Sequence, residues 1–145
     1  MELNKIYNEN CLDTMARMPD NFIDLTVTSP PYDDLRTYNG YSFDFESIAK
    51  ELYRVTKEGG IVVWIVGDET INGSETGTSF KQVLYFMECG FNLHDTMIYE
   101  KNSSSFPSSV DSNRYTQIFE SMFILSKGKI EIDYKMRFPE ASKKR

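Results

Sequence analysis

The amino-acid sequence predicts a single α/β domain in which strands and helices alternate along the chain. The continuous apolar run "IVVWIV", residues 61–66, lies between glycines and has the length of a central parallel strand covered on both faces. Apolar residues over 45–53 recur with helical spacing, and residues 23–28 alternate as in a strand. A chain of 145 residues is long enough for one hydrophobic core.

The first third of the sequence predicts a strand, a short helix and a second strand. "KIYNE", residues 5–9, is a short possible strand, and the Pro19-Asp20-Asn21 turn ends a brief helix marked by Leu12, Met15 and Ala16. The helix over 45–53 has Asp44 and Glu46 at its start. We expect Lys57 in its last turn and Gly59-Gly60 directly after it.

The later part of the chain predicts one more helix and two strands. Phe80, Val83, Leu84 and Met87 fall on one helical face, and Gly90 ends that helix. "TMIYEK" and "SMFILS" are apolar strand candidates that can pair as an antiparallel edge of the sheet. Right-handed crossovers then give a sheet with helices packed against it.

Composition excludes several classes of function. Cys11 and Cys89 are only a pair, nothing sits at metal-ligand spacing and the single His94 cannot complete a site, so we expect no metal site and reduced thiols. The polar N-terminus and the lack of an apolar run near 18 residues predict a soluble, cytoplasmic protein without a signal peptide or a membrane span.

Charge divides the chain into two parts. Residues 1–126 hold 9 basic and 19 acidic side chains, whereas residues 127–145 hold 7 basic and 3 acidic ones. We therefore predict a folded catalytic part over 1–126 and a basic, solvated C-terminal tail over 127–145. Because phosphate contacts need Lys and Arg, the acidic part is not a general polyanion binder and meets nucleic acid only locally or with help from another segment or chain.

The stretch "TSPPY", residues 28–32, lies where the strand over 23–28 ends. Ser29 and Pro30 each precede a proline and are held extended, and neither proline has an N–H to continue a β-ladder. The backbone carbonyls, the Ser29 hydroxyl and the Tyr32 ring suit a planar group that carries an NH2. Ligands in such sheets bind at the carboxyl ends of the strands, so this stretch is the main candidate site.

At these residues the sequence resembles a known family. "DLTVTSPPY" closely resembles the catalytic motif of DNA amino-methyltransferases, which transfer a methyl group from S-adenosyl-L-methionine to the exocyclic amine of adenine or cytosine. "NENCLDTMARMPDNFIDLTVTSPPY", "ELYRVTKEGGIVVWIVGD" and "FESMFILSKG" resemble the family's flanking elements, so the likeness covers roughly residues 5–129. The resemblance implies a Rossmann-like methyltransferase fold and a role in restriction-modification, with DNA as partner.

The resemblance also implies roles for single residues. Ser29 and the Pro30 carbonyl would accept hydrogen bonds from the target amine, Pro31 would keep the backbone rigid, and Tyr32 would stack on a flipped base. Positioning and polarisation would provide the catalysis. Ser at the first motif position occurs with both target bases, so adenine and cytosine both remain open.

Other residues carry weaker predictions with plain structural alternatives. Asn10 stands where many relatives carry an Asp near the adenosine of the cofactor, or is a simple turn residue. Arg36 either contacts a DNA phosphate or forms an ion pair within its loop. Phe106 and Tyr115 either help to pack the flipped base or belong to the packing of the core or the sheet edge. The loop "GDETINGSETGTSF", residues 67–80, lines the pocket or caps the next helix through a Thr or Ser.

The sequence departs from the family at the cofactor site. Relatives hold S-adenosyl-L-methionine on a glycine turn of the form D-P-F-x-G-x-G, and no G-x-G occurs in these 145 residues. We therefore expect the catalytic half alone, with the first strands and the glycine turn of the fold absent through truncation, a split gene or degeneration. Such a half would form a homodimer or need a separate cofactor-binding chain. The alternative is a non-catalytic fragment that acts as a binding or assembly module.

Overall fold

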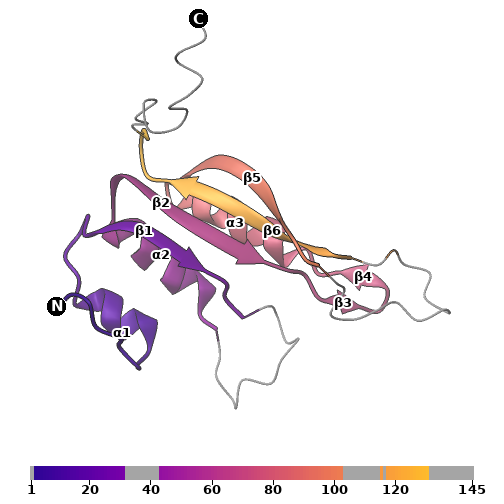
Figure 1. Cartoon of the computed structure of the whole chain (residues 1–145), viewed down its shortest axis with the longest axis horizontal. Helices are drawn as coiled ribbons and strands as arrows, with labels where there is room; N and C mark the ends of the chain where they lie inside the picture. The colour runs from indigo at the N-terminus through magenta and orange to yellow at the C-terminus, as the bar shows by residue number, and fades with distance from the viewer. Residues whose placement is uncertain (1, 32–42, 103–114, 116, 131–145) are drawn as a thin grey trace, which may run out of the picture.

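A four-stranded sheet with helices against it forms the body of the protein (Figure 1). The structure, a computed structural model, describes residues 2–31, 43–102, 115 and 117–130. In chain order the elements are α1 (Cys11–Ala16), β1 (Ile23–Thr28), α2 (Phe45–Val55), β2 (Thr56–Val66), β3 (Thr70–Ile71), β4 (Ser74–Glu75), α3 (Thr78–Glu88), β5 (Asn92–Glu100) and β6 (Phe119–Ser126).

The sheet has the strand order β1-β2-β6-β5. β1 runs parallel to β2, while β6 is antiparallel to both β2 and β5. This arrangement confirms the predicted α/β fold and the antiparallel pairing of the last two strands. The short strands β3 and β4 form a separate hairpin beyond the end of β2 (Figure 1).

The core lies on one face of the sheet, under α2 and α3. Val62, Trp64 and Val66 of β2 and Phe123 and Leu125 of β6 are buried there. The helices contribute Ile48, Ala49, Leu52, Val55, Val83 and Phe86. Alternate residues of each strand point to this face, so the buried set is the inward half of the strand pattern.

The other face of the sheet is apolar but uncovered in the described part of the chain. Because α2 and α3 pack on the same side, the described residues cover β2 on one face, and the expected cover on the second face stays a prediction. Cross-strand pairing places one set of apolar side chains on the uncovered face, and we call these eight residues the open face: Leu25, Val27, Ile61, Val63, Ile65, Met97, Met122 and Ile124.

Arg54 of α2 joins this helix to α1 and to the turn after it through hydrogen bonds. The Arg54 guanidinium donates to the backbone carbonyls of Met15 and Met18, at 2.7 and 2.9 Å, and pairs with the carboxylates of Asp20 and Glu51. Those two carboxylates raise the pKa of Arg54, since their hydrogen bonds favour the charged guanidinium. The predicted brief helix is confirmed, and its C-terminal carbonyls are satisfied by a side chain from the next helix.

Two predicted elements in the first half of the chain differ in detail. Residues 5–9 form no strand, because no described strand lies beside them, and Ile6 is 99% exposed. Helix α2 ends at Val55, before the last turn that was expected to hold Lys57, so Lys57 and the glycine pair lie inside β2. Lys57 bonds the Asp24 carboxylate of the neighbouring strand instead of lying in the last turn of the helix.

Helix α3 presents a different face to the core than expected. Val83 and Phe86 are buried, whereas Phe80, Leu84 and Met87 are 60%, 58% and 45% exposed. Ser79 and Gln82 are buried beside the core because each has a hydrogen-bond partner, so polar residues occupy part of the inward face.

Lys127 does not belong to a solvated tail. Its ammonium group donates to the Asn21 side chain and to the Tyr53 carbonyl, both at 2.9 Å, and lies 4.5 Å from the Tyr53 ring centre. Only 8% of the residue is exposed. The predicted tail over 131–145 lies outside the described residues.

Candidate functional site

The stretch Ser29-Pro30-Pro31 follows the carboxyl end of β1, and we call these three residues the ledge. Ser29 is exposed, Pro30 is buried and Pro31 is half-buried. The last residue of β1, Thr28, pairs with Trp64 of β2, so the ledge extends from a strand that is anchored to the centre of the sheet. The prolines end the ladder at this point because they lack an N–H.

The ledge borders a cavity of about 480 Å³ between β1, α1 and α2. This volume is in the range of small-molecule sites in proteins. Its walls come from the N-terminal segment, both helices, the strand and the ledge. The lining residues are Tyr7, Glu9, Cys11, Thr14, Met15, Met18, Ile23, Thr26, Thr28, Ser29, Pro30, Pro31, Phe43, Ile48, Leu52, Val55 and Trp64.

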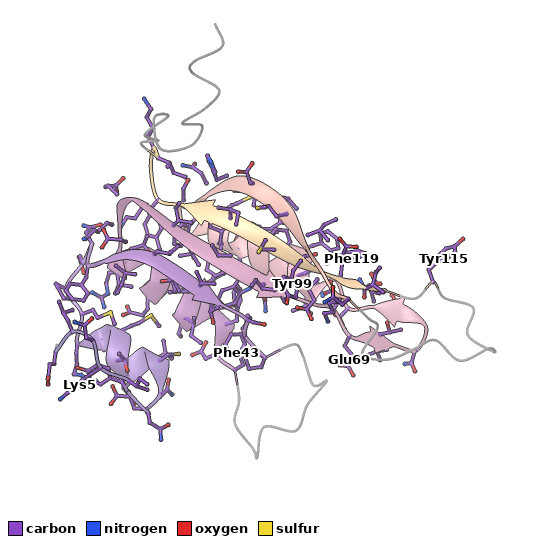
Figure 2. All side chains as sticks on the ribbon, in the orientation of Figure 1. Lys5, Phe43, Glu69, Tyr99, Tyr115 and Phe119 are labelled. Carbon is purple, nitrogen blue, oxygen red and sulfur yellow. The ribbon has the colours of Figure 1, made fainter. Side chains whose placement is uncertain are left out.

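Aromatic rings form the wall of this cavity nearest the core. Phe43 and Trp64 stack with ring centres 6.4 Å apart and an interplanar angle of 26°. The Trp64 indole donates its N–H to the Gln82 side-chain oxygen at 2.8 Å, which fixes the ring through α3. Figure 2 shows Phe43 near the end of β1 in that view. Helix α3 therefore fixes one ring of this wall.

A carboxylate, that of Glu9, also lines the cavity. Glu9 accepts hydrogen bonds from the Arg17 guanidinium and from the Thr14 hydroxyl. These bonds, the one from Arg17 first, lower the pKa of the Glu9 carboxyl. The N-terminal segment therefore brings a negative charge to a cavity whose remaining lining is mostly apolar.

The structure places some of the other predicted site residues. The Asn10 side chain accepts a hydrogen bond from the Leu12 N–H at 3.0 Å as the N-cap of α1, and Asn10 does not line the cavity. Tyr115 is fully exposed and lies far from Phe43 in Figure 2. Tyr32, Arg36 and Phe106 lie outside the described residues. The roles predicted for these five residues remain predictions.

The loop after β2 holds the start of α3. The Asp68 carboxylate accepts from the Ser79 backbone N–H at 2.8 Å and from the Ser79 hydroxyl at 2.5 Å. The N-cap position itself is Gly77, which makes no side-chain cap bond, so the expected cap by Thr or Ser is replaced by Asp68. None of the described residues of this loop lines the cavity beside the ledge.

Several lining residues were not singled out from the sequence. Tyr7, Glu9, Cys11, Phe43 and Trp64 all face the cavity. A sequence signal exists for Trp64, which lies in the centre of the apolar run 61–66, and the parallel register of β1 and β2 places it opposite Thr28. Tyr7, Glu9 and Cys11 depend on how α1 and the segment before it fold back, which has no periodic signature. Phe43 precedes α2 outside any regular element.

In the residues that the structure describes, no group of three or more His, Cys, Asp or Glu side chains is arranged to hold a metal ion. No helix among these residues is both long and apolar enough to cross a membrane.

Sequence comparisons give a consistent result. A family model described as DNA methylase, of the N6/N4 type, matches residues 23–145. The orphan methyltransferase M.BamHII of Bacillus amyloliquefaciens is 76% identical over 110 residues, which are 76% of this chain and 40% of that protein. The type II methyltransferase M.BglII of Bacillus subtilis is 39% identical over 71 residues, or 45% of this chain and 20% of that protein. The chain thus spans less than half of the length of these relatives.

Solved structures share the fold at low sequence identity. The cytosine-N4-specific PvuII DNA methyltransferase matches with a TM-score of 0.73 and 19% identity, over 93% of this chain and 53% of that one. M1.HpyAVI in complex with S-adenosylmethionine matches with a TM-score of 0.63 and 18% identity, over 88% of this chain and 56% of that one. Both neighbours contain nearly as much chain again outside the matched part.

Proposed function

Because the chain belongs to the N6/N4 DNA methylase family, we propose that it is the catalytic part of a DNA methyltransferase. The reaction is transfer of a methyl group to the exocyclic amine of adenine or cytosine in DNA. The cofactor of the family is S-adenosylmethionine, which supplies the methyl group when bound. The names of the relatives support a role in restriction-modification. We propose that the protein acts in the cytoplasm and that its substrate is DNA.

The observation that carries this proposal is the position of the ledge. Ser29, Pro30 and Pro31 leave the sheet at a carboxyl strand end and border a cavity large enough for a small planar molecule. Thr28 is tied to Trp64, and that ring is fixed by Gln82, so the ledge rests on a rigid support. Rigid acceptors are what a reaction based on positioning requires.

The ledge acts on the substrate amine through hydrogen bonds. The Ser29 hydroxyl and the Pro30 carbonyl each accept from one N–H of the amine. With both N–H groups held, the nitrogen lone pair is less able to delocalise into the ring of the base, so the nitrogen becomes a better nucleophile. Pro31 keeps the two acceptors at a fixed separation, and the ring of Tyr32 stacks on the flipped base.

The residues outside the ledge have supporting roles in this proposal. Arg36 contacts a DNA phosphate, while Phe106 and Tyr115 pack against the flipped base. Asn10 fixes the start of α1, which forms one wall of the cavity, and brings that wall near the adenosine of the cofactor.

The described residues fit only part of a cofactor site. Gly73 and Gly77 lie beyond the end of β2, but added side chains there would meet no atom within 4 Å, so neither glycine forms a close cradle. The sequence also lacks a G-x-G turn. This chain therefore offers the amine-binding ledge, and the turn that holds the cofactor has to come from another stretch of polypeptide.

A test of the ledge needs a completed enzyme. The chain is co-expressed with the part of M.BamHII that lies outside the matched 110 residues, and methyl transfer to duplex DNA is measured with radiolabelled S-adenosylmethionine. Loss of one acceptor in Ser29→Ala is expected to lower kcat about 10- to 100-fold. Ser29→Asn restores an acceptor and is expected to recover most of the rate.

Each result of this test has a definite meaning. Equal rates for the wild type and Ser29→Ala would contradict the role of Ser29. A folded, completed wild-type protein that never methylates DNA would contradict the proposed function and favour a non-catalytic binding module. Pro19→Ala, in the turn before β1, serves as the control for a substitution near the ledge but outside it.

A further inference from the structure

Three exposed apolar side chains form a stripe along α3. Phe80, Leu84 and Met87 follow one another at helical spacing, which places them on one flank of the helix. The buried hydrogen bonds of Ser79 and Gln82 hold the helix in this rotation. An apolar stripe of this kind is typical of a contact between helices, whereas a solvated flank carries polar residues.

The stripe lies on the flank of α3 that faces away from α2. Tyr85 marks the opposite flank, because its ring centre lies 5.5 Å from that of Phe45 and its hydroxyl donates to the Glu46 carboxylate at 3.4 Å. In Figure 1, α2 lies toward β1 and α3 toward β5, and these two strands are the opposite ends of the order β1-β2-β6-β5. The stripe therefore points to the β5 border of the molecule.

At the same border β5 is an edge strand. Among the described residues β6 is the one strand beside it, and the range Asn92–Glu100 contains no Pro and no Lys, the residues by which edge strands commonly resist pairing. A register shift disturbs its start, which leaves the part from Thr96 onward regular. Thr96 lies opposite the buried Phe123, so Thr96 and the exposed Ile98 face the helix side, as the stripe does.

We propose that this border binds a second copy of the chain around a two-fold axis that passes near Leu84 and Thr96. The β5 strands of the two copies pair antiparallel, so that their sheets become one continuous sheet. The two α3 helices then lie side by side in opposite directions, and their stripes are buried against each other. This assembly is independent of the proposed methyl transfer.

The charges beside the stripe favour a second copy as the partner. Lys81 lies one turn before Leu84 and Glu88 one turn after it, and both side chains are exposed. An antiparallel pair of helices centred on Leu84 therefore brings Lys81 of each copy next to Glu88 of the other. The Lys81 ammonium donates to the Thr76 carbonyl at 3.1 Å, which leaves it further N–H groups for a carboxylate.

The residues of β5 also pair with their own copy without repulsion. With Thr96 on the axis, Asp95 lies opposite Met97 of the other copy. Glu100 then lies near the start of the other β5, where Asn92 and Leu93 are uncharged. Neither acidic residue of the strand meets a like charge, which would destabilise the pair.

The oligomeric state of the chain tests this surface. Light scattering and sedimentation equilibrium give the dimer dissociation constant, at about 0.15 M salt so that repulsion between the acidic chains is screened. Leu84→Lys is expected to raise this constant at least about tenfold, because it brings two like charges together in an apolar contact.

Leu25 provides the matched control. It is also a leucine and, like Leu84, is 58% exposed, but it lies on the open face in β1, at the other end of the sheet. Leu25→Lys is expected to leave the dissociation constant unchanged. Circular dichroism verifies that both variants fold.

A disulfide across the axis tests the strand pairing directly. Thr96→Cys is made in a Cys11→Ser, Cys89→Ser background, and covalent dimer is measured on non-reducing gels after oxidation with diamide. Opposite residues of paired antiparallel strands have Cβ atoms about 4.5 to 5.5 Å apart, which small strand movements bring into disulfide range. Thr70→Cys, at an exposed threonine of β3, is the control and is expected to cross-link far more slowly.

Each outcome supports or overturns the proposal. A dimer that Leu84→Lys dissociates and Thr96→Cys cross-links supports it. A monomeric wild type would overturn it, and slow hydrogen exchange of β5 in that monomer would show that another segment of the same chain covers the edge. A dimer that Leu25→Lys dissociates, or equal cross-linking at positions 96 and 70, would also overturn it, by placing the contact elsewhere.

Discussion

Trp64 of β2 donates its indole N–H to the side-chain oxygen of Gln82 in α3, at a distance of 2.8 Å. Both residues are buried, at 1% and 5% exposure. Trp64 also lies beside Thr28 in the register of β1 and β2, one residue before the ledge. This hydrogen bond therefore links α3 to β2, the strand that pairs with the one ending in the ledge.

The variant Trp64→Phe is expected to lose about 1 to 3 kcal/mol of stability, because the Gln82 oxygen is left buried without its donor. Gln82→Met alone leaves the indole N–H unpaired at a similar cost. The double variant removes both polar groups and is expected to be more stable than the sum of the single losses predicts. Urea unfolding followed by circular dichroism gives the three values, and strict additivity would contradict a direct coupling.

Arg54 is expected to hold α1 on the fold. Arg54→Met keeps the apolar stem but removes the guanidinium donor from the carbonyls of Met15, which still accepts from the Met18 N–H, and Met18, at a cost of about 2 kcal/mol. The partner carboxylates contribute less, because ion pairs near the surface are weak. Asp20→Asn is therefore expected to cost under about 1 kcal/mol, and an equal loss in both variants would contradict this division.

Much of the fold follows from the sequence because its strands and helices have strong periods. The runs over 23–28 and 61–66 became β1 and β2, and the apolar spacing after Asp44 became α2. The ledge followed from chemistry, since two consecutive prolines have few ways to leave a strand. These signals lie within short stretches of sequence, so they can be recognised without knowing which elements pack against them in the fold.

The sequence does not predict features that depend on distant contacts. The apolar period of α3 suggested Phe80 and Leu84 as core residues, but Asp68 and Trp64 bond Ser79 and Gln82 and turn the helix the other way. Which face of β2 is buried depends on the side of the sheet against which α2 and α3 pack. Glu9 lines the cavity because of the path taken by the N-terminal segment before α1, which has no regular structure.

Acid is expected to loosen the attachment of α1. Hydrogen bonds from Arg17 and Arg54 lower the pKa values of Glu9 and Glu51 below 4.5. Because the folded pKa values are depressed, the stabilisation is complete above pH 4.5 and is lost as the pH falls through the lowered values.

Thermal unfolding between neutral pH and about pH 3 measures this effect. The double variant Glu9→Gln, Glu51→Gln is expected to start from a lower midpoint and to lose less on acidification than the wild type. Parallel curves for the two proteins would show that neither carboxylate contributes to the pH dependence.

Tyr32 is expected to contribute stacking to the proposed reaction. In the completed enzyme Tyr32→Ala is expected to weaken binding of the flipped base by about 1 to 3 kcal/mol. Tyr32→Phe keeps the ring and serves as the matched control. Fluorescence of 2-aminopurine at the target position reports the stacked state, and identical signals for the Ala and Phe variants would contradict the assignment.

The last prediction concerns two glycines that share a left-handed backbone but differ in their surroundings. Gly90 has φ +114°, and an added Cβ would come within 2.7 Å of the Tyr53 ring, whereas Gly73 has φ +79° and no atom within 4 Å. Gly73→Ala is expected to cost about 1 kcal/mol from backbone strain alone. Gly90→Ala adds the clash and is expected to cost about 2 to 4 kcal/mol.

Replacement of the ring separates the two contributions at Gly90. In a Tyr53→Leu background the clash is relieved, so the additional cost of Gly90→Ala is expected to fall toward that of Gly73→Ala. Denaturant unfolding of the four proteins gives the coupling energy between positions 53 and 90. An unchanged cost in the Tyr53→Leu background would mean that backbone conformation, and not the packing of Tyr53, explains the glycine at this turn.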